Sequence, residues 1–296
     1  MKIKQISIGW LRFIETPLEK PIDKGIEENF ILHDFNKKLS KITKKWYKWQ
    51  KLLFFWLGIR QLITISETIF ERGINMTLDD LKKEYDKLQL KYGAKELDSI
   101  YNGGCLDNPD ICFVFMNPTG KNIASSKSWK GLKAPWIGTK NIWDLFYELK
   151  LLDKDIYDKI KTIKGTDWTE EFACEVYNNV KKHKYFITNL GKCTQIDARP
   201  LPDSVYKEYL HLLEKEIEII NPKVIVLFGN QVSSIVLNEK ISVSQCRKKE
   251  FEKDINGKKY KCYSVFYPVG NGRFNIGKSI EDINYIIDNI NDKIVV

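Results

Sequence analysis

From residue 76 onward, four short apolar runs alternate with amphipathic segments. The first run is Ile111–Met116, in which aromatic and β-branched residues follow one another without a polar interruption. Such a run is typical of a strand buried on both faces, as in a parallel sheet. The other three predicted strands are Tyr185–Thr188, Val224–Phe228 and Tyr263–Tyr267.

The segments between these runs have the 3.6-residue spacing of helices. Thr77-x-x-Asp80 resembles a capping box, and the apolar residues after it share one face until Gly93 ends the helix. Asn256-Gly257, between two polar segments, predicts a β-hairpin. Further helices are predicted over residues 141–151, 168–182 and 202–220, directly after Gly229, and from a cap formed by Ser279 and Asp282.

Strands that alternate with helices predict a sheet with helices on both faces. We therefore expect an α/β protein: a three-layer α/β/α domain whose mostly parallel sheet has about four strands. Because the alternation begins at Met76, we place this domain at residues 76–296.

Residues 1–75 form a predicted N-terminal helical extension that is basic and rich in aromatic residues. They hold 14 Lys and Arg against 8 Asp and Glu, and Lys37–Leu62 is the segment expected to be helical. Three interpretations stay open: an arm packed on the domain, a surface for nucleic acid or membrane, or a segment upstream of the true start.

Composition permits a globular protein with an anionic partner. The chain is 43% hydrophobic, which excludes global disorder, and its net charge of +9 is compatible with nucleic acid binding. No secretory signal is visible, and the apolar run Leu52–Ile59 is too short to span a bilayer. The six cysteines are scattered without a Cys-x-x-Cys pair, so we expect reduced thiols, a cytoplasmic location and no membrane association.

Three of the predicted strands end in loops of unusual composition. These loops are Asn117–Gly120, Asn189–Cys193 and Tyr267–Arg273, which combine amides, prolines, glycines and single charged residues. The carboxyl ends of parallel strands lie at one edge of a sheet, where open α/β sheets bind their ligands. We therefore expect the three loops to converge on one site.

Together these loops resemble the motifs of the uracil-DNA glycosylase superfamily, over roughly Ser99–Ile290. Phe115–Gly120 is similar to the first motif in the Asn-Pro form of the mismatch-specific and single-strand-selective branches. Tyr185–Cys193, followed by Arg199–Asp203, resembles the thermostable iron–sulfur branch. Tyr267–Arg273 has the length and the Pro, Gly and Arg placement of the second motif.

The resemblance implies hydrolysis of the N-glycosidic bond of a damaged base, with uracil the expected base, after it is flipped out of DNA. The catalytic residues would be Asn117, which can orient a water molecule, and Tyr267, which can hydrogen-bond the departing base. Trp136 would stack on the base, Asn189 would recognise the uracil edge with its amide, and Met116 would also contact the base.

The second motif and its surroundings would bind DNA. Gly270, Asn271 and Arg273 lie on a glycine-rich loop that can approach the duplex, with Asn271 and Arg273 as candidates for wedge and phosphate anchor. Lys192 is a further candidate for DNA contact. The expected partner is uracil-containing or otherwise damaged DNA, bound by a monomer.

The sequence departs from the family pattern in two motifs. Tyr267 stands where the second motif has His or Asn, and Val269 replaces the usual Ser. Only Cys193 matches a ligand of the iron–sulfur branch, while Glu208 and Tyr209 occupy the stretch of its partner cysteine. An iron–sulfur cluster needs its full set of thiolates, so we expect no cluster, no metal and no other cofactor.

Two alternatives to an active glycosylase remain. The chain could be a catalytically inactive nucleic-acid-binding module with a glycosylase fold. A nucleotide-binding α/β protein is the other alternative, although no glycine-rich phosphate loop follows the first strand.

Overall fold

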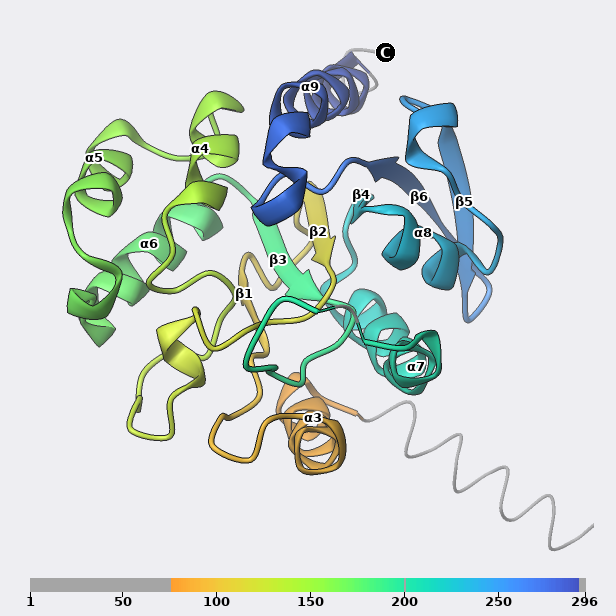
Figure 1. Ribbon diagram of the computed structural model, residues 1–296. Helices are drawn as coiled ribbons and strands as arrows, with labels where there is room; N and C mark the ends of the chain where they lie inside the picture. The colour runs from red at the N-terminus through yellow and green to blue at the C-terminus, as the bar shows by residue number, and fades with distance from the viewer. Residues whose placement is uncertain (1–75, 200, 293–296) are drawn as a thin grey trace, which may run out of the picture. The chain divides into compact units, whose positions relative to one another are not determined.

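A six-stranded mixed sheet forms the centre of the computed structural model, which describes residues 76–199 and 201–292. The strand order is β1-β3-β2-β4-β6-β5 (Figure 1), and the four central strands run parallel. The two edge strands β1 and β5 pair antiparallel with β3 and β6. The strands are β1 Asn102–Gly104, β2 Ile111–Phe115, β3 Tyr185–Asn189, β4 Val224–Phe228, β5 Glu250–Ile255 and β6 Lys258–Val265.

The prediction of about four mostly parallel strands fits the centre of this sheet but is wrong for its edges. β1 has the sequence Asn-Gly-Gly, which carries no apolar pattern. β5 alternates between exposed and partly buried residues, as expected for an edge strand. The predicted hairpin is confirmed, because Asn256 and Gly257 join β5 to β6 with φ angles of 51° and 82°.

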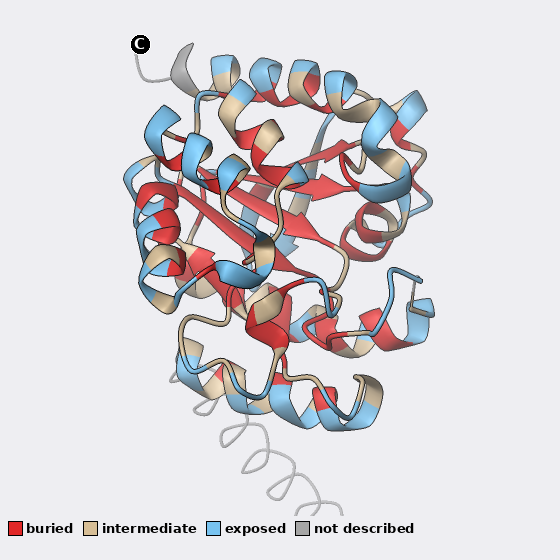
Figure 2. Ribbon diagram, turned by 60° about the vertical axis from the view of Figure 1, so that its left-hand side comes forward, coloured by how far each residue is buried: buried red, intermediate tan, exposed pale blue. Residues whose placement is uncertain are grey.

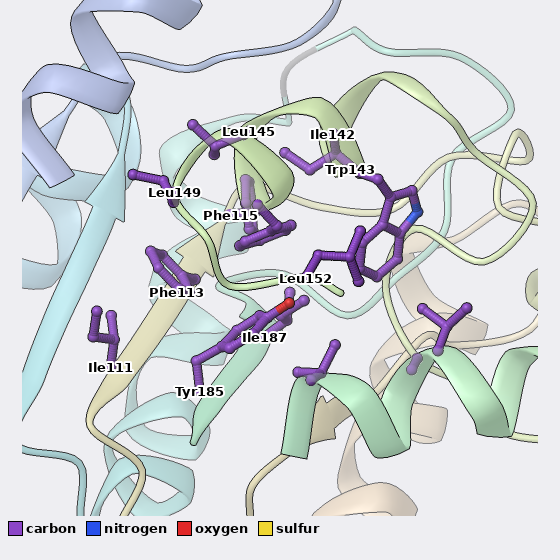
Figure 3. Packing of buried hydrophobic residues seen from close by; sticks show 14 of the residues in the cluster. Ile111, Phe113, Phe115, Ile142, Trp143, Leu145, Leu149, Leu152, Tyr185 and Ile187 are labelled. Carbon is purple, nitrogen blue, oxygen red and sulfur yellow. The ribbon is translucent and has the colours of Figure 1, made fainter. Parts of the chain in front are cut away.

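Alternate residues of the central strands face opposite layers, as the period of two in a strand requires. Phe113 and Phe115 point into the cluster under α4 and α6 (Figure 3), whereas Cys112 and Val114 point toward α7 and α8. β2, β3 and β4 are buried throughout, and each helix has one buried and one exposed side (Figure 2). The predicted three-layer arrangement is therefore present.

Seven α-helices lie in the described part of the chain. α4, α5, α6 and α9 cover one face of the sheet, and α7 and α8 cover the other, with α3 packed on α7 (Figure 1). Their bounds are α3 Leu78–Tyr92, α4 Asn141–Glu148, α5 Lys154–Thr162, α6 Glu170–Lys182, α7 Asp203–Ile220, α8 Asn230–Leu237 and α9 Ile276–Asp292.

The helix ends test the predicted caps. Thr77 and Asp80 form the expected capping box, in which the Asp80 amide donates to Thr77 Oγ1 over 3.2 Å. The cap predicted at Ser279 is wrong, because α9 begins at Ile276. Ser279 Oγ instead donates to the backbone oxygen of Phe266, and Asp282 is buried in an ion pair with Arg247. α5 was not predicted.

The predicted extension over residues 1–75 lies outside the described residues. The helix expected over Lys37–Leu62 and the domain boundary at residue 76 therefore stay predictions. Within the described ranges, no helix is both long enough and apolar enough to cross a membrane.

The parallel register places the ends of β2 and β3 side by side. Phe115 pairs with Asn189, and the pairing continues into both loops. Leu190 N donates to Phe115 O over 2.7 Å, and Gly191 N donates to Met116 O over 2.8 Å. The loops that follow these two strands therefore start at the same level of one sheet edge.

Candidate functional site

A cavity of about 640 Å³ lies at this edge of the sheet. Its wall combines the loop after β2, the long connection to α4, the end of β3 and the loop after β6. Five predicted site residues line it together: Asn117, Trp136, Asn189, Tyr267 and Gly270. The expected convergence of the three loops is thus present in the structure.

One ring at the end of β2 organises the aromatic wall. Phe115 stacks on Phe228 with ring centroids 4.2 Å apart. The same ring meets Trp136 edge-on at 5.0 Å and Tyr267 edge-on at 6.1 Å. Because aromatic rings prefer such stacked and T-shaped contacts, Phe115 fixes the positions of both cavity residues.

The backbone of Trp136 is in the left-handed region, with a φ of 70°. A bulky residue is an outlier there, and such strain persists only where the surroundings impose it. Gly138, two residues later, also has a positive φ, and a Cβ there would lie 2.9 Å from Ile123 Cγ2. Close packing thus holds this turn, and Trp136 on it, against the cavity.

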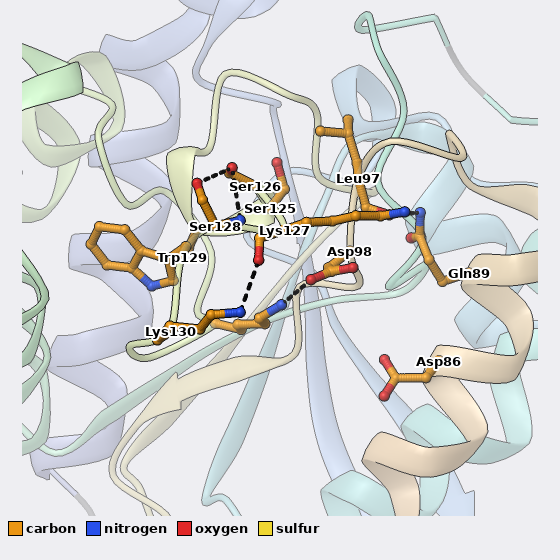
Figure 4. Close-up of polar contacts among 12 residues, drawn as sticks. Asp86, Gln89, Leu97, Asp98, Ser125, Ser126, Lys127, Ser128, Trp129 and Lys130 are labelled. Carbon is orange, nitrogen blue, oxygen red and sulfur yellow. Dashed lines mark hydrogen bonds and ion pairs between the residues drawn. The ribbon is translucent and has the colours of Figure 1, made fainter.

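The loop that leads to Trp136 is ordered by its own polar contacts (Figure 4). Ser126 Oγ and Ser128 Oγ are 2.7 Å apart, and Lys130 Nζ donates to Lys127 O over 3.1 Å. Lys133 forms an ion pair with Asp98. These contacts connect the loop to itself and to the segment before β1, so that it presents a defined wall.

Asn117 and Asn189 contribute two amides of different character. Asn117 is half-buried; its Oδ1 accepts from Tyr206 over 2.6 Å and its Nδ2 donates to Pro118 O over 3.1 Å. Asn189 is 2% exposed, and its Nδ2 has no hydrogen-bond partner among the described residues. A buried donor without a partner costs about 1–3 kcal/mol, so Asn189 is poised to bind an acceptor on a ligand.

The charge of the cavity wall is one-sided. Its charged residues are Lys121 and Lys140, and no Asp, Glu, His or Cys of the described chain lines it. Burial raises the pKa of Tyr267 above its ordinary value, so the phenol keeps its proton at neutral pH and can donate a hydrogen bond. Val269 adds an apolar surface to the same wall. This site offers donors to a polar or anionic ligand and contains no carboxylate base.

The loop after β6 runs from the cavity wall to the protein surface, where its later residues are exposed. It forms the 3₁₀-helix η4, Gly270–Asn275, and a Cβ at Gly272 would lie only 2.1 Å from Tyr267 O. Asn271 and Arg273 are exposed outside the cavity, and Arg273 Nη2 lies 3.5 Å from Asp144 Oδ2. The side chain that sequence analysis missed is Phe274, which is 84% exposed on the same loop. In the sequence, the signal for Phe274 is an apolar residue next to Arg273 in a loop that is otherwise polar and rich in glycine.

Two residues predicted to contact DNA or the base do not line the cavity. Lys192 is fully buried, with its Nζ 3.0 Å from Glu216 Oε2 and above the ring of Tyr85, so it cannot reach DNA. Burial lowers the pKa of Lys192, and Glu216 opposes that shift. Met116 does not line the cavity and packs against the cluster on the α7 and α8 side, because successive strand residues face opposite layers. Neither residue is positioned to contact DNA or a base.

The residues around Cys193 do not fit an iron–sulfur cluster. Cys193 is buried among apolar and aromatic side chains, and the rings of Tyr85 and Tyr209 lie 6.5 Å apart in the same group. All six cysteines are free. In the part of the chain that the structure describes, no three His, Cys, Asp or Glu side chains are grouped so that they could hold a metal ion.

The family comparison agrees with this geometry. The family model described as the uracil DNA glycosylase superfamily matches residues 103–279. This match spans more than half of the chain and contains the ends of β2, β3 and β6 with all three of their loops.

The buried pair of Lys192 and Glu216 generates a stability prediction. We expect Lys192→Met to lower the free energy of unfolding by about 3–5 kcal/mol, because Glu216 would remain as an unpaired buried charge. The double variant Lys192→Met/Glu216→Gln should recover part of this loss. Urea unfolding measures both values, and a loss below about 1 kcal/mol in the single variant would show that the pair behaves like an exposed one.

Proposed function

The chain belongs to the uracil DNA glycosylase superfamily, and from that membership we propose that it hydrolyses the N-glycosidic bond of a damaged base, uracil in the first instance, flipped out of DNA. The observation that carries the proposal is the single cavity that unites Asn117, Asn189, Trp136 and Tyr267 without any carboxylate. Each of these groups has a role in such a reaction.

Base recognition is assigned to Asn189 and Trp136. The unpartnered Nδ2 of Asn189 would donate to a base carbonyl, and its Oδ1 can accept from the neighbouring N–H, as the O4/N3 edge of uracil requires. Trp136 supplies the π-face for the base. Because Asn189 is almost fully buried, a base in a stacked duplex could not reach it, which supports flipping.

Bond cleavage is assigned to neutral donors. Without a carboxylate the site cannot strongly deprotonate water, so the C1′–N bond breaks first and its electron pair leaves with the base. The protonated hydroxyl of Tyr267 would donate to the departing base anion. Asn117 would orient the attacking water molecule. The water oxygen adds to C1′, and the proton that the water loses goes to the base anion.

Engagement of the duplex is assigned to the loop after β6. Phe274 is apolar, flat and exposed, and such a side chain can fill the gap that a flipped base leaves. Arg273 on the same loop would anchor a phosphate, and Asn271 would lie beside the wedge.

We expect the full-length protein to convert a uracil-containing oligonucleotide into an alkali-labile product. Asn117→Ala should slow this conversion about 10²-fold because the water loses its orientation, with DNA affinity unchanged by fluorescence anisotropy. Asn178→Ala, on an exposed position of α6 outside the cavity, is the matched control. Salt-dependent binding without any cleavage would instead favour the inactive binding module.

The pH dependence distinguishes a phenol from an imidazole at position 267. The wild-type single-turnover rate should not change with pH because of Tyr267 between about pH 6 and 9, since the phenol stays protonated there. Tyr267→Phe should lower the rate about 10²-fold by removing the donor. In Tyr267→His the rate should fall as pH rises and the imidazolium loses its proton, at a pH below about 6.5 because burial lowers the pKa of an imidazole. A pH-independent Tyr267→His variant would refute the donor role.

The wedge assignment predicts a dependence on DNA structure. Phe274→Ala should slow cleavage of duplex DNA by about tenfold and affect single-stranded DNA much less, since only the duplex leaves a gap to fill. Tyr285→Ala removes another exposed aromatic side chain, on α9, and should leave both rates unchanged. Equal losses on both substrates in Phe274→Ala would contradict a wedge.

A further inference from the structure

Tyr206 connects the first turn of α7 to the first motif. Its side chain is fully buried, yet its hydroxyl lies 2.6 Å from Asn117 Oδ1 at the cavity wall. Tyr206 does not itself line the cavity. The hydrogen bond to Asn117 therefore connects this residue to the cavity wall.

The hydrogen bonds around Tyr206 have a fixed direction. The Tyr206 hydroxyl donates to Asn117 Oδ1 over 2.6 Å, since an amide oxygen can only accept. Pro118 O can only accept, and Asn117 Nδ2 donates to it over 3.1 Å. The amide of Asn117 therefore cannot exchange its oxygen and nitrogen ends.

Packing supports the same arrangement. Gly191 lies between the two side chains: a Cβ there would be 3.0 Å from Tyr206 Cε1 and 3.5 Å from Asn117 Cβ. Gly191 N donates a hydrogen bond to Met116 O, which fixes the loop after β3 against the loop after β2. The ring of Tyr206 is thus confined beside Asn117.

We propose that Tyr206 is a positioning residue that orients the Asn117 amide for its role with water. The proposal rests on the proposed function. With one Oδ1 lone pair taken by Tyr206 and one Nδ2 proton taken by Pro118, one lone pair and one N–H remain for the water. The two protein contacts set the directions of this remaining lone pair and N–H, so the amide does not have to reorient when water binds.

A kinetic experiment separates positioning from simple structural support. Tyr206→Phe keeps the buried ring and removes only the hydroxyl. We expect its single-turnover rate on uracil-containing DNA to fall about tenfold while the dissociation constant for DNA stays unchanged. Tyr209→Phe is the matched control, since Tyr209 is also fully buried on α7 but lies beside Cys193, away from Asn117. That variant should keep the wild-type rate.

A titration tests the contact without relying on activity. In the variant Asn117→Asp, the Tyr206 hydroxyl would donate to the new carboxylate and hold its pKa down. Adding Tyr206→Phe should then raise the pKa of that carboxyl by about 1, measured by ¹³C NMR, because a donated hydrogen bond favours the charged form. Adding Tyr209→Phe instead should leave it unchanged.

The outcomes are distinguishable. A slower Tyr206→Phe variant together with the raised carboxyl pKa supports the positioning role. Wild-type rates in Tyr206→Phe, or an unchanged carboxyl pKa, overturn that role while the proposed function stands. A wild-type protein that releases no damaged base overturns the proposed function and the positioning role with it.

Discussion

A buried ion pair holds together the segments on which the site depends. Glu216 of α7 binds Lys192 from the loop after β3, and it also accepts from Asn102 of β1 and Thr188 of β3, each over 2.6 Å. Lys192 in turn lies above the ring of Tyr85 on α3. Taking both charges out of water is costly, and this dense set of partners offsets the cost. The pair therefore fixes α7, and with it the loops at the sheet edge, in one arrangement.

Negative charge is kept behind the site rather than within it. The amides, indole and phenol of the cavity are neutral, and its charged residues are lysines. A wall of neutral donors and lysines, without carboxylates, suits a reaction in which negative charge develops on a departing group, since fixed dipoles need little reorganisation. The ion pair supplies rigidity, and the cavity wall presents hydrogen-bond donors. Phe115 belongs to the hydrophobic core and also contacts Trp136 and Tyr267 in the cavity wall.

Sequence patterns predicted those parts of the molecule whose physics is local. Continuous apolar runs gave the central strands, and the polar ends of those strands gave the residues that meet in the cavity. Contacts between distant segments were not visible. A lysine in a polar loop predicts a solvent-exposed side chain. Nothing in the sequence near Lys192 indicates that Glu216, 24 positions later, pairs with it inside the core. Likewise Ser279 and Asp282 have the spacing of a cap, although a tertiary ion pair with Arg247 uses the aspartate. The Asn-Gly-Gly strand β1 owes its conformation to pairing with β3 alone.

The left-handed backbone at Trp136 has a consequence for how this protein can vary. A bulky residue in that conformation costs the folded state about 1–3 kcal/mol, whereas glycine would adopt it without strain. Glycine would, however, forfeit the edge-on contact that the indole makes with Phe115, with ring centroids 5.0 Å apart. At position 136 the strain of the backbone and the packing of the ring therefore act on the folded state in opposite directions.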